Sequence, residues 1–168
     1  MIDEQRTRPV LVGDERATLT SVLQRQRDTL MMKCAGLTDE QLRCKAVVPS
    51  GLSLIGLVRH LAEVERGWFR NVLNDEDVRG YFPKNAGGEW TEFHVEDADP
   101  AEAFRIWEAT CARSRAIVDA AESLDVTGRY GDEKYSLHYV LAHMIEEYAR
   151  HNGHADLLRE AIDGATGE

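Results

Sequence analysis

Apolar side chains recur every three or four residues along most of this chain, which is the period of an amphipathic α-helix. No segment of useful length alternates between apolar and polar residues as a half-buried strand does. The pattern predicts four long helices and one short helical turn, over residues 14–35, 38–42, 53–73, 100–121 and 136–162. Asp14 and Asp99 stand where N-cap residues are expected, and Gly164 follows the end of the last helix.

A polar stretch, residues 74–99, joins the second and third long helices. It contains Pro83, and its aromatic residues indicate that it packs against the helices. A connection of about 25 residues is long enough to cross a bundle, so the two helices that it joins are free to run parallel. The sequence therefore predicts an all-α fold, a four-helix bundle with a long crossover between its second and third helices, in a single domain over residues 1–168.

Composition and charge exclude several classes of partner. The chain has 30 acidic and 20 basic residues among 168, which gives a net charge of −10. Phosphate backbones and anionic membrane surfaces repel such a chain, so neither nucleic acid nor a membrane is an expected partner. No apolar run reaches the length of a membrane span, and residues 1–8 show no signal-peptide pattern. Three cysteines without C-x-x-C spacing favour reduced thiols in a cytoplasmic protein.

The last long helix carries two polar residues within its apolar stripe. At about 100° per residue, Glu147 and His151 lie one turn apart in the middle of the inward-facing side. Burying a carboxylate costs several kcal/mol unless a partner compensates it. The spacing therefore predicts either a buried ion pair that only fixes register or two ligands of one metal ion, and by itself favours neither.

His60 supplies a third candidate from the second long helix. It lies beside the apolar stripe of that helix, on a strip shared with Gly56, Val64 and Gly67. Glycine in a helix interior costs about 1 kcal/mol relative to alanine, so two glycines near His60 indicate space for a ligand or for close helix approach. The alternative is an ordinary half-buried histidine. Together with Glu147 and His151, His60 makes a set of three potential ligands. Three protein ligands with one open position are typical of catalytic metal sites.

Other side chains near these positions are further candidates. His143 precedes the Glu–His pair by one turn and His154 follows it by three residues, so either could take a ligand place or line the site, or be an ordinary helix-face histidine. Glu63, one turn after the histidine of the second helix, is a candidate catalytic residue for proton handling. Trp90 and His94 in the crossover are candidates for lining the substrate and cofactor pocket, with a solvated loop as the alternative. The chain lacks nucleotide-binding, serine-hydrolase and H-E-x-x-H motifs, and the two E-x-x-H motifs of a di-iron site.

Two runs of the sequence, residues 53–69 around His60 and residues 143–156 around Glu147 and His151, resemble the DinB/YfiT-like superfamily. The chain is more closely similar to its mini-circle-type branch, which includes actinobacterial mycothiol-dependent S-transferases and maleylpyruvate isomerase. The resemblance covers nearly the whole chain. It implies a DinB-like four-helix bundle that holds one divalent ion, usually zinc or nickel, with a histidine of the second helix and a pair one turn apart on the last. On this resemblance His60, Glu147 and His151 are the ligands, in the His/Glu/His variant.

The resemblance also implies a reaction. We expect a cytoplasmic transferase in which a low-molecular-weight thiol, mycothiol, is activated as a metal-bound thiolate and attacks an electrophile. The alternatives are a metal-dependent isomerase or hydrolase on the same scaffold, in which the open position carries water, and a non-catalytic, stress-associated metal-binding bundle. Family members are often homodimers, which this sequence neither shows nor excludes. The superfamily name evokes DNA damage, but the net charge of −10 gives no support for DNA binding.

Overall fold

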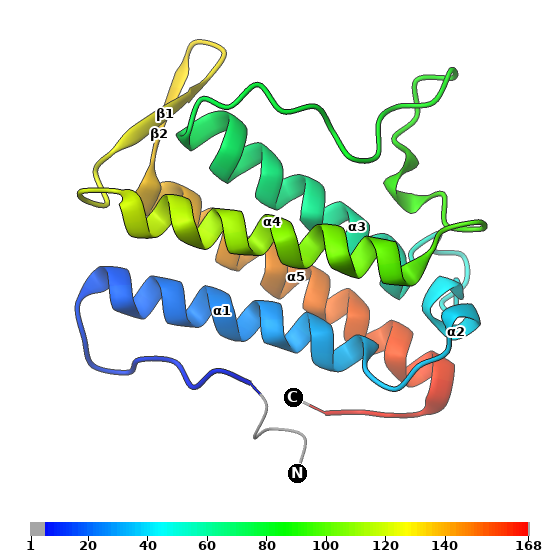
Figure 1. Cartoon of the computed structure of the whole chain (residues 1–168). Helices are drawn as coiled ribbons and strands as arrows, with labels where there is room; N and C mark the ends of the chain where they lie inside the picture. The colour runs from blue at the N-terminus through cyan, green and yellow to red at the C-terminus, as the bar shows by residue number, and fades with distance from the viewer. Residues whose placement is uncertain (1–5, 168) are drawn as a thin grey trace.

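The computed structural model describes residues 6–167 of the chain, and this part is mostly helical (Figure 1). Its elements follow in the order α1 (Glu15–Cys34), α2 (Asp39–Arg43), α3 (Leu54–Glu65), η2 (Arg66–Leu73), η3 (Thr91–Phe93), α4 (Pro100–Ala120), β1 (Thr127–Tyr130), β2 (Glu133–Ser136) and α5 (Leu137–Asp163). The mainly helical class predicted from the sequence is confirmed. The absence of a signal-peptide pattern was inferred from residues 1–8, most of which lie outside the described part.

The predicted helix ends are stabilised by the residues that the sequence singles out. The Asp14 side chain accepts a hydrogen bond from the backbone of α1, and Asp99 does the same for α4. Thr38 and Gln41 form a reciprocal capping box around α2, which satisfies two backbone donors at once. At the end of α5, Gly164 has φ of +75°, a conformation that favours glycine because it has no Cβ.

The four long helical segments lie side by side, with α1 against α5 and α3 against α4 (Figure 1). The chain runs in one direction through α1 and α5 and in the opposite direction through α3, η2 and α4. The second and third long helices are therefore parallel, as the long crossover allows. Leucines and aromatic residues from all four segments fill the interior, among them Leu23, Leu30, Leu57, Leu61, Phe69, Trp107, Leu141 and Tyr148. None of the helices over residues 6–167 is both long and apolar enough to cross a membrane.

A short antiparallel hairpin between α4 and α5 was not predicted from the sequence. Its strands pair from Thr127 with Ser136 to Tyr130 with Glu133. Each strand has only four residues, too few to show the two-residue period of a half-buried strand. Gly128 lies so close to η2 that a Cβ there would be 1.8 Å from the Val72 carbonyl oxygen, so the hairpin can pack in this way only with glycine.

The second long helix is continuous, but its geometry changes at Glu65. Residues 54–65 are α-helical, and residues 66–73 form a π-helical segment, with the amide of Asn74 bonded to the carbonyl oxygen of Phe69. A π-helical turn inserts residues relative to the α-helical period. The uniform helix predicted over 53–73 is therefore correct in extent and incomplete in geometry.

Candidate metal centre

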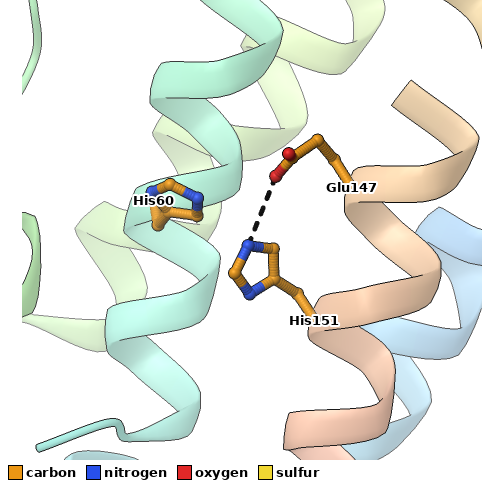
Figure 2. A group of neighbouring side chains, drawn as sticks. All are labelled: His60, Glu147 and His151. Atoms are coloured by element: carbon orange, nitrogen blue, oxygen red, sulfur yellow. Dashed lines mark ion pairs between the residues drawn. The ribbon is translucent and has the colours of Figure 1, made fainter. Parts of the chain in front are cut away.

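Three side chains from two helices point into the space between α3 and α5 (Figure 2). His60 comes from α3, and Glu147 and His151 come from α5. One potential ligand atom of each lies within 4.8 Å of the others, and no other such group of three was found within residues 6–167. The His60 and His151 rings meet edge to face with their centroids 4.7 Å apart. The structure therefore brings together the three residues that the sequence and the resemblance single out.

The α5 pair sits at the edge of the helix face that forms the core, whereas the sequence places it in the middle. The side chains of His60, Glu147 and His151 are 21%, 14% and 12% exposed. The buried positions of α5 include Tyr148 and Asn152. The Tyr148 hydroxyl donates a hydrogen bond to Glu65, and Asn152 Nδ2 donates to Gln26, so the core face of α5 is centred on these residues and not on the Glu–His pair. The three side chains are thus partly exposed to solvent.

One distance in the group matches the spacing of two ligands on a tetrahedral ion. His151 Nε2 lies 3.4 Å from Glu147 Oε2. Two ligand atoms that are each about 2.1 Å from a tetrahedral ion lie about 3.4 Å from each other, so this pair already has the required spacing. Two imidazoles and one carboxylate also form a common ligand set for catalytic zinc. The residues present therefore fit a divalent ion, as the sequence predicts.

The protonation state of His151 also suits a ligand. Burial, and then the nearby His60 ring, lower the pKa of His151 to about 4, although Glu147 acts in the opposite direction. The imidazole is therefore neutral near pH 7, and it keeps the lone pair that a metal ion needs.

His60 has two neighbours from the crossover, Glu92 and Phe93, and the sequence analysis did not identify Glu92 as a site residue. Its Nδ1 lies 3.1 Å from Glu92 Oε1, and its ring stacks on Phe93 with the centroids 5.3 Å apart. Both residues belong to η3. Glu92 was missed because a residue in an irregular crossover carries no periodic signal that would show which side chain it faces.

The two additional histidines of α5 lie next to the group. His143 Nε2 is 3.9 Å from Glu147 Oε1, and the His143 ring contacts Trp68 with the centroids 4.7 Å apart. His154 Nδ1 is 3.3 Å from His151 Nδ1. Neither belongs to the group of three, and each contacts one of its members.

Glu63 lies in a different environment. Its carboxylate accepts hydrogen bonds from Arg66 Nε at 2.7 Å and from the backbone amide of Phe82 at 2.7 Å. These contacts fasten the crossover to α3. The structure does not bring Glu63 to the group of three side chains.

Trp90 and His94 also lie away from the three side chains. Trp90 is 55% exposed and stacks on the Lys84 ammonium. His94 lines a cavity of about 430 Å³ between the crossover and α4, together with Arg59 and Tyr81. None of the three candidate ligands lines this cavity. Phe93, between these two positions, is the crossover aromatic residue that contacts His60.

A second polar cluster is fully buried and was also missed. Arg27 of α1 donates two hydrogen bonds to Glu65, at 2.7 and 2.9 Å, and Tyr148 donates a third at 2.9 Å. Trp107 donates to the Tyr148 hydroxyl, and Cys111 Sγ lies 3.6 Å from Glu65. Burial alone would raise the pKa of Glu65, but Arg27 and these hydrogen bonds hold it below its usual value. The sequence did contain a signal, because Glu65 lies one turn from both Leu61 and Phe69 in an otherwise apolar stripe.

Comparison with known protein families gives one match for this chain. A family model described as Mycothiol-S-transferase matches residues 18–164, which include the three candidate ligands and most of the chain. No curated protein sequence matches the chain.

Proposed function

Because the chain belongs to the mycothiol-S-transferase family, we propose that it is a divalent-metal-dependent transferase that joins mycothiol to an electrophile. His60, Glu147 and His151 are the metal ligands in this proposal. The observation that carries it is the convergence of these side chains, from two helices, within 4.8 Å in a chain that matches the family over residues 18–164.

The side chains supply one carboxyl group and two imidazoles as potential metal ligands. Glu147 provides the carboxylate, and the lowered pKa of His151 keeps its imidazole neutral. When bound there, a zinc or nickel ion would favour the deprotonated form of the co-substrate thiol near neutral pH. The sulfur then forms a bond to the electrophilic carbon, whose leaving group departs with its electron pair, and the thiol proton passes to solvent. The three proposed ligands are partly exposed, so a substrate is able to reach them from solvent.

Several broader features belong to the same proposal. The arrangement of α1, α3 with η2, α4 and α5 supports a DinB-like four-helix bundle. The net charge of −10 supports small-molecule partners over nucleic acid or a membrane. The three cysteines without C-x-x-C spacing support a cytoplasmic location. The contacts of Glu63 favour a role in fastening the crossover over proton transfer.

The test is a rate measurement with defined substrates. Purified protein loaded with zinc or nickel is mixed with mycothiol and monochlorobimane, and the fluorescent adduct is followed over time. We expect His60→Ala and His151→Ala to lower the enzymatic rate by at least about a hundredfold, because each removes one of three ligands. His138→Ala is the matched control, since His138 lies on the same helix, is about half exposed and contacts Glu15.

One outcome of this rate measurement would contradict the proposed function. Equal rates for wild type and His151→Ala, at equal protein concentration and with both proteins folded, would overturn the proposal. Replacing mycothiol by cysteine tests the choice of thiol, and an unchanged rate with cysteine would overturn that choice alone.

A further inference from the structure

Glu92 is a buried carboxylate in the middle of the irregular crossover. It is 7% exposed, and its Oε1 lies 3.1 Å from His60 Nδ1. A buried carboxylate is costly unless it is hydrogen-bonded or paired. The Arg59 guanidinium also interacts with it electrostatically. Glu92 thus faces two adjacent residues of α3, one of which is a candidate metal ligand.

The backbone around Glu92 is fixed in place by contacts on both sides. Arg59 donates a hydrogen bond to the carbonyl oxygen of His94 at 2.6 Å, and Val95 is buried in the core. Phe93 stacks on His60 and also packs over Gly56, where an added Cβ would lie 3.2 Å from the Phe93 ring. The glycine beside His60 therefore makes room for the crossover. This explains one of the two glycines that the sequence analysis linked to the histidine.

An imidazole that binds a metal ion through one nitrogen usually donates a hydrogen bond from the other. The carboxylate at Nδ1 leaves Nε2 of His60 as the nitrogen with a free lone pair. Figure 2 shows one ring nitrogen of His60 on the side that faces Glu147 and His151. The partner at Nδ1 and the orientation of the ring therefore both indicate that Nε2 is the nitrogen available to bind a metal ion.

We infer that Glu92 is a positioning residue of the metal centre: its carboxylate accepts a hydrogen bond from His60 Nδ1–H and so fixes the tautomer and the ring orientation in which Nε2 binds the metal ion. The inference rests on the proposed function, since it assumes that His60 is a ligand. It makes the crossover part of the site through η3, while Trp90 and His94 on either side of this turn lie away from it.

The first test is metal affinity, measured without any turnover. Zinc dissociation constants are determined by competition with a chromophoric chelator for wild type, Glu92→Gln, Glu92→Ala and Glu96→Gln. Loss of a carboxylate that orients a ligand typically weakens metal binding about 10- to 100-fold, which is the change expected for both Glu92 variants. Glu96→Gln is the matched control, because Glu96 lies in the same crossover with an exposed side chain that pairs with Lys45. We expect its dissociation constant to stay within about twofold of wild type.

The second test separates positioning from simple attachment of the crossover. ¹⁵N–¹H correlation spectra of the metal-free protein are expected to show His60 with its proton on Nδ1 in wild type and in Glu96→Gln. In Glu92→Ala we expect this tautomer to lose its predominance. Melting temperatures of the metal-free proteins verify that the variants are folded, and Glu92→Gln, which keeps the shape of the side chain, provides a second folded variant.

The outcomes distinguish this inference from the proposed function. Wild-type zinc affinity in both folded Glu92 variants would overturn the role of Glu92 and leave the transferase proposal standing. A wild-type protein that binds neither zinc nor nickel would overturn the transferase proposal, and the inference with it. Tight binding by wild type, with weaker binding only in the Glu92 variants, supports both.

Discussion

Two polar clusters lie in this helical protein, and they differ in how well their charges are matched. The Arg27–Glu65 pair is fully buried, is joined by two short hydrogen bonds and is completed by Tyr148. In the group of His60, Glu147 and His151, the carboxylate contact to His151 is long, at 3.4 Å, and two imidazoles face each other. In the first cluster the buried charges of Arg27 and Glu65 compensate each other without a bound ion. In the proposed metal centre, a cation between the three side chains would provide the match that Arg27 already provides for Glu65.

The largest expected effect comes from breaking the buried pair. Arg27→Ala leaves the Glu65 carboxylate uncompensated in the core, and we expect the free energy of unfolding to fall by about 3–5 kcal/mol. Urea denaturation followed by circular dichroism measures it. A loss below about 1 kcal/mol would contradict the view that the two charges depend on each other.

A double replacement sharpens this prediction. Arg27→Met together with Glu65→Leu removes both charges and keeps most of the volume, so we expect it to be more stable than Arg27→Ala alone. The same urea experiment compares the two. If the double variant is the less stable, the network contributes more than the compensation of one charge by the other.

The proposed metal ligands should show the opposite behaviour, with little effect on stability until a metal ion is added. In the metal-free state, His151→Ala is expected to change the free energy of unfolding by no more than about 1 kcal/mol, because the ring is partly exposed. At a free zinc concentration of about 100 times the dissociation constant, wild type should gain about 2.7 kcal/mol, and the variant should lose most of this gain. Melting curves with and without zinc measure both effects. An equal zinc-dependent gain in the two proteins would contradict the assignment of His151 as a ligand.

The smallest effect concerns a surface carboxylate and pH. Partial burial would raise the pKa of Glu76, but hydrogen bonds from Arg113 and Arg70 outweigh it and lower the pKa to about 2. Because the folded-state pKa is below the ordinary value of 4.5, the stabilisation is fully present above pH 4.5 and is lost as the pH falls toward 2. We expect Glu76→Gln to be less stable than wild type by at most about 1 kcal/mol at neutral pH. The difference, measured by urea denaturation, should shrink from about pH 6 to about pH 3, and a growing difference would contradict the sign.

Much of the fold followed from the sequence because its signals are local. Helix periodicity and caps such as Asp14 and Asp99 depend on neighbouring residues, so the bounds of the long helices agree closely with the structure. The hairpin at 127–136 was missed because its strands are too short for a period, and its position depends on contact with η2. The π-helical geometry of η2 has no simple pattern of apolar residues that would predict it.

In the candidate site, too, the local features were predictable from the sequence, and the contacts between elements were not. The i, i+4 spacing placed Glu147 and His151 together on one helix face, the glycine strip of the second helix indicated His60, and the family resemblance implied that the three are ligands of one ion. By itself the sequence determined which residues share a helix face and which of them are able to bind a metal ion. Only the tertiary structure decided that Glu92, 32 residues from His60, contacts its ring, and that Arg27 of α1 neutralises Glu65 of α3. The physical reason is that a helix fixes the direction of its own side chains, whereas contacts between separate elements depend on the path of the chain between them.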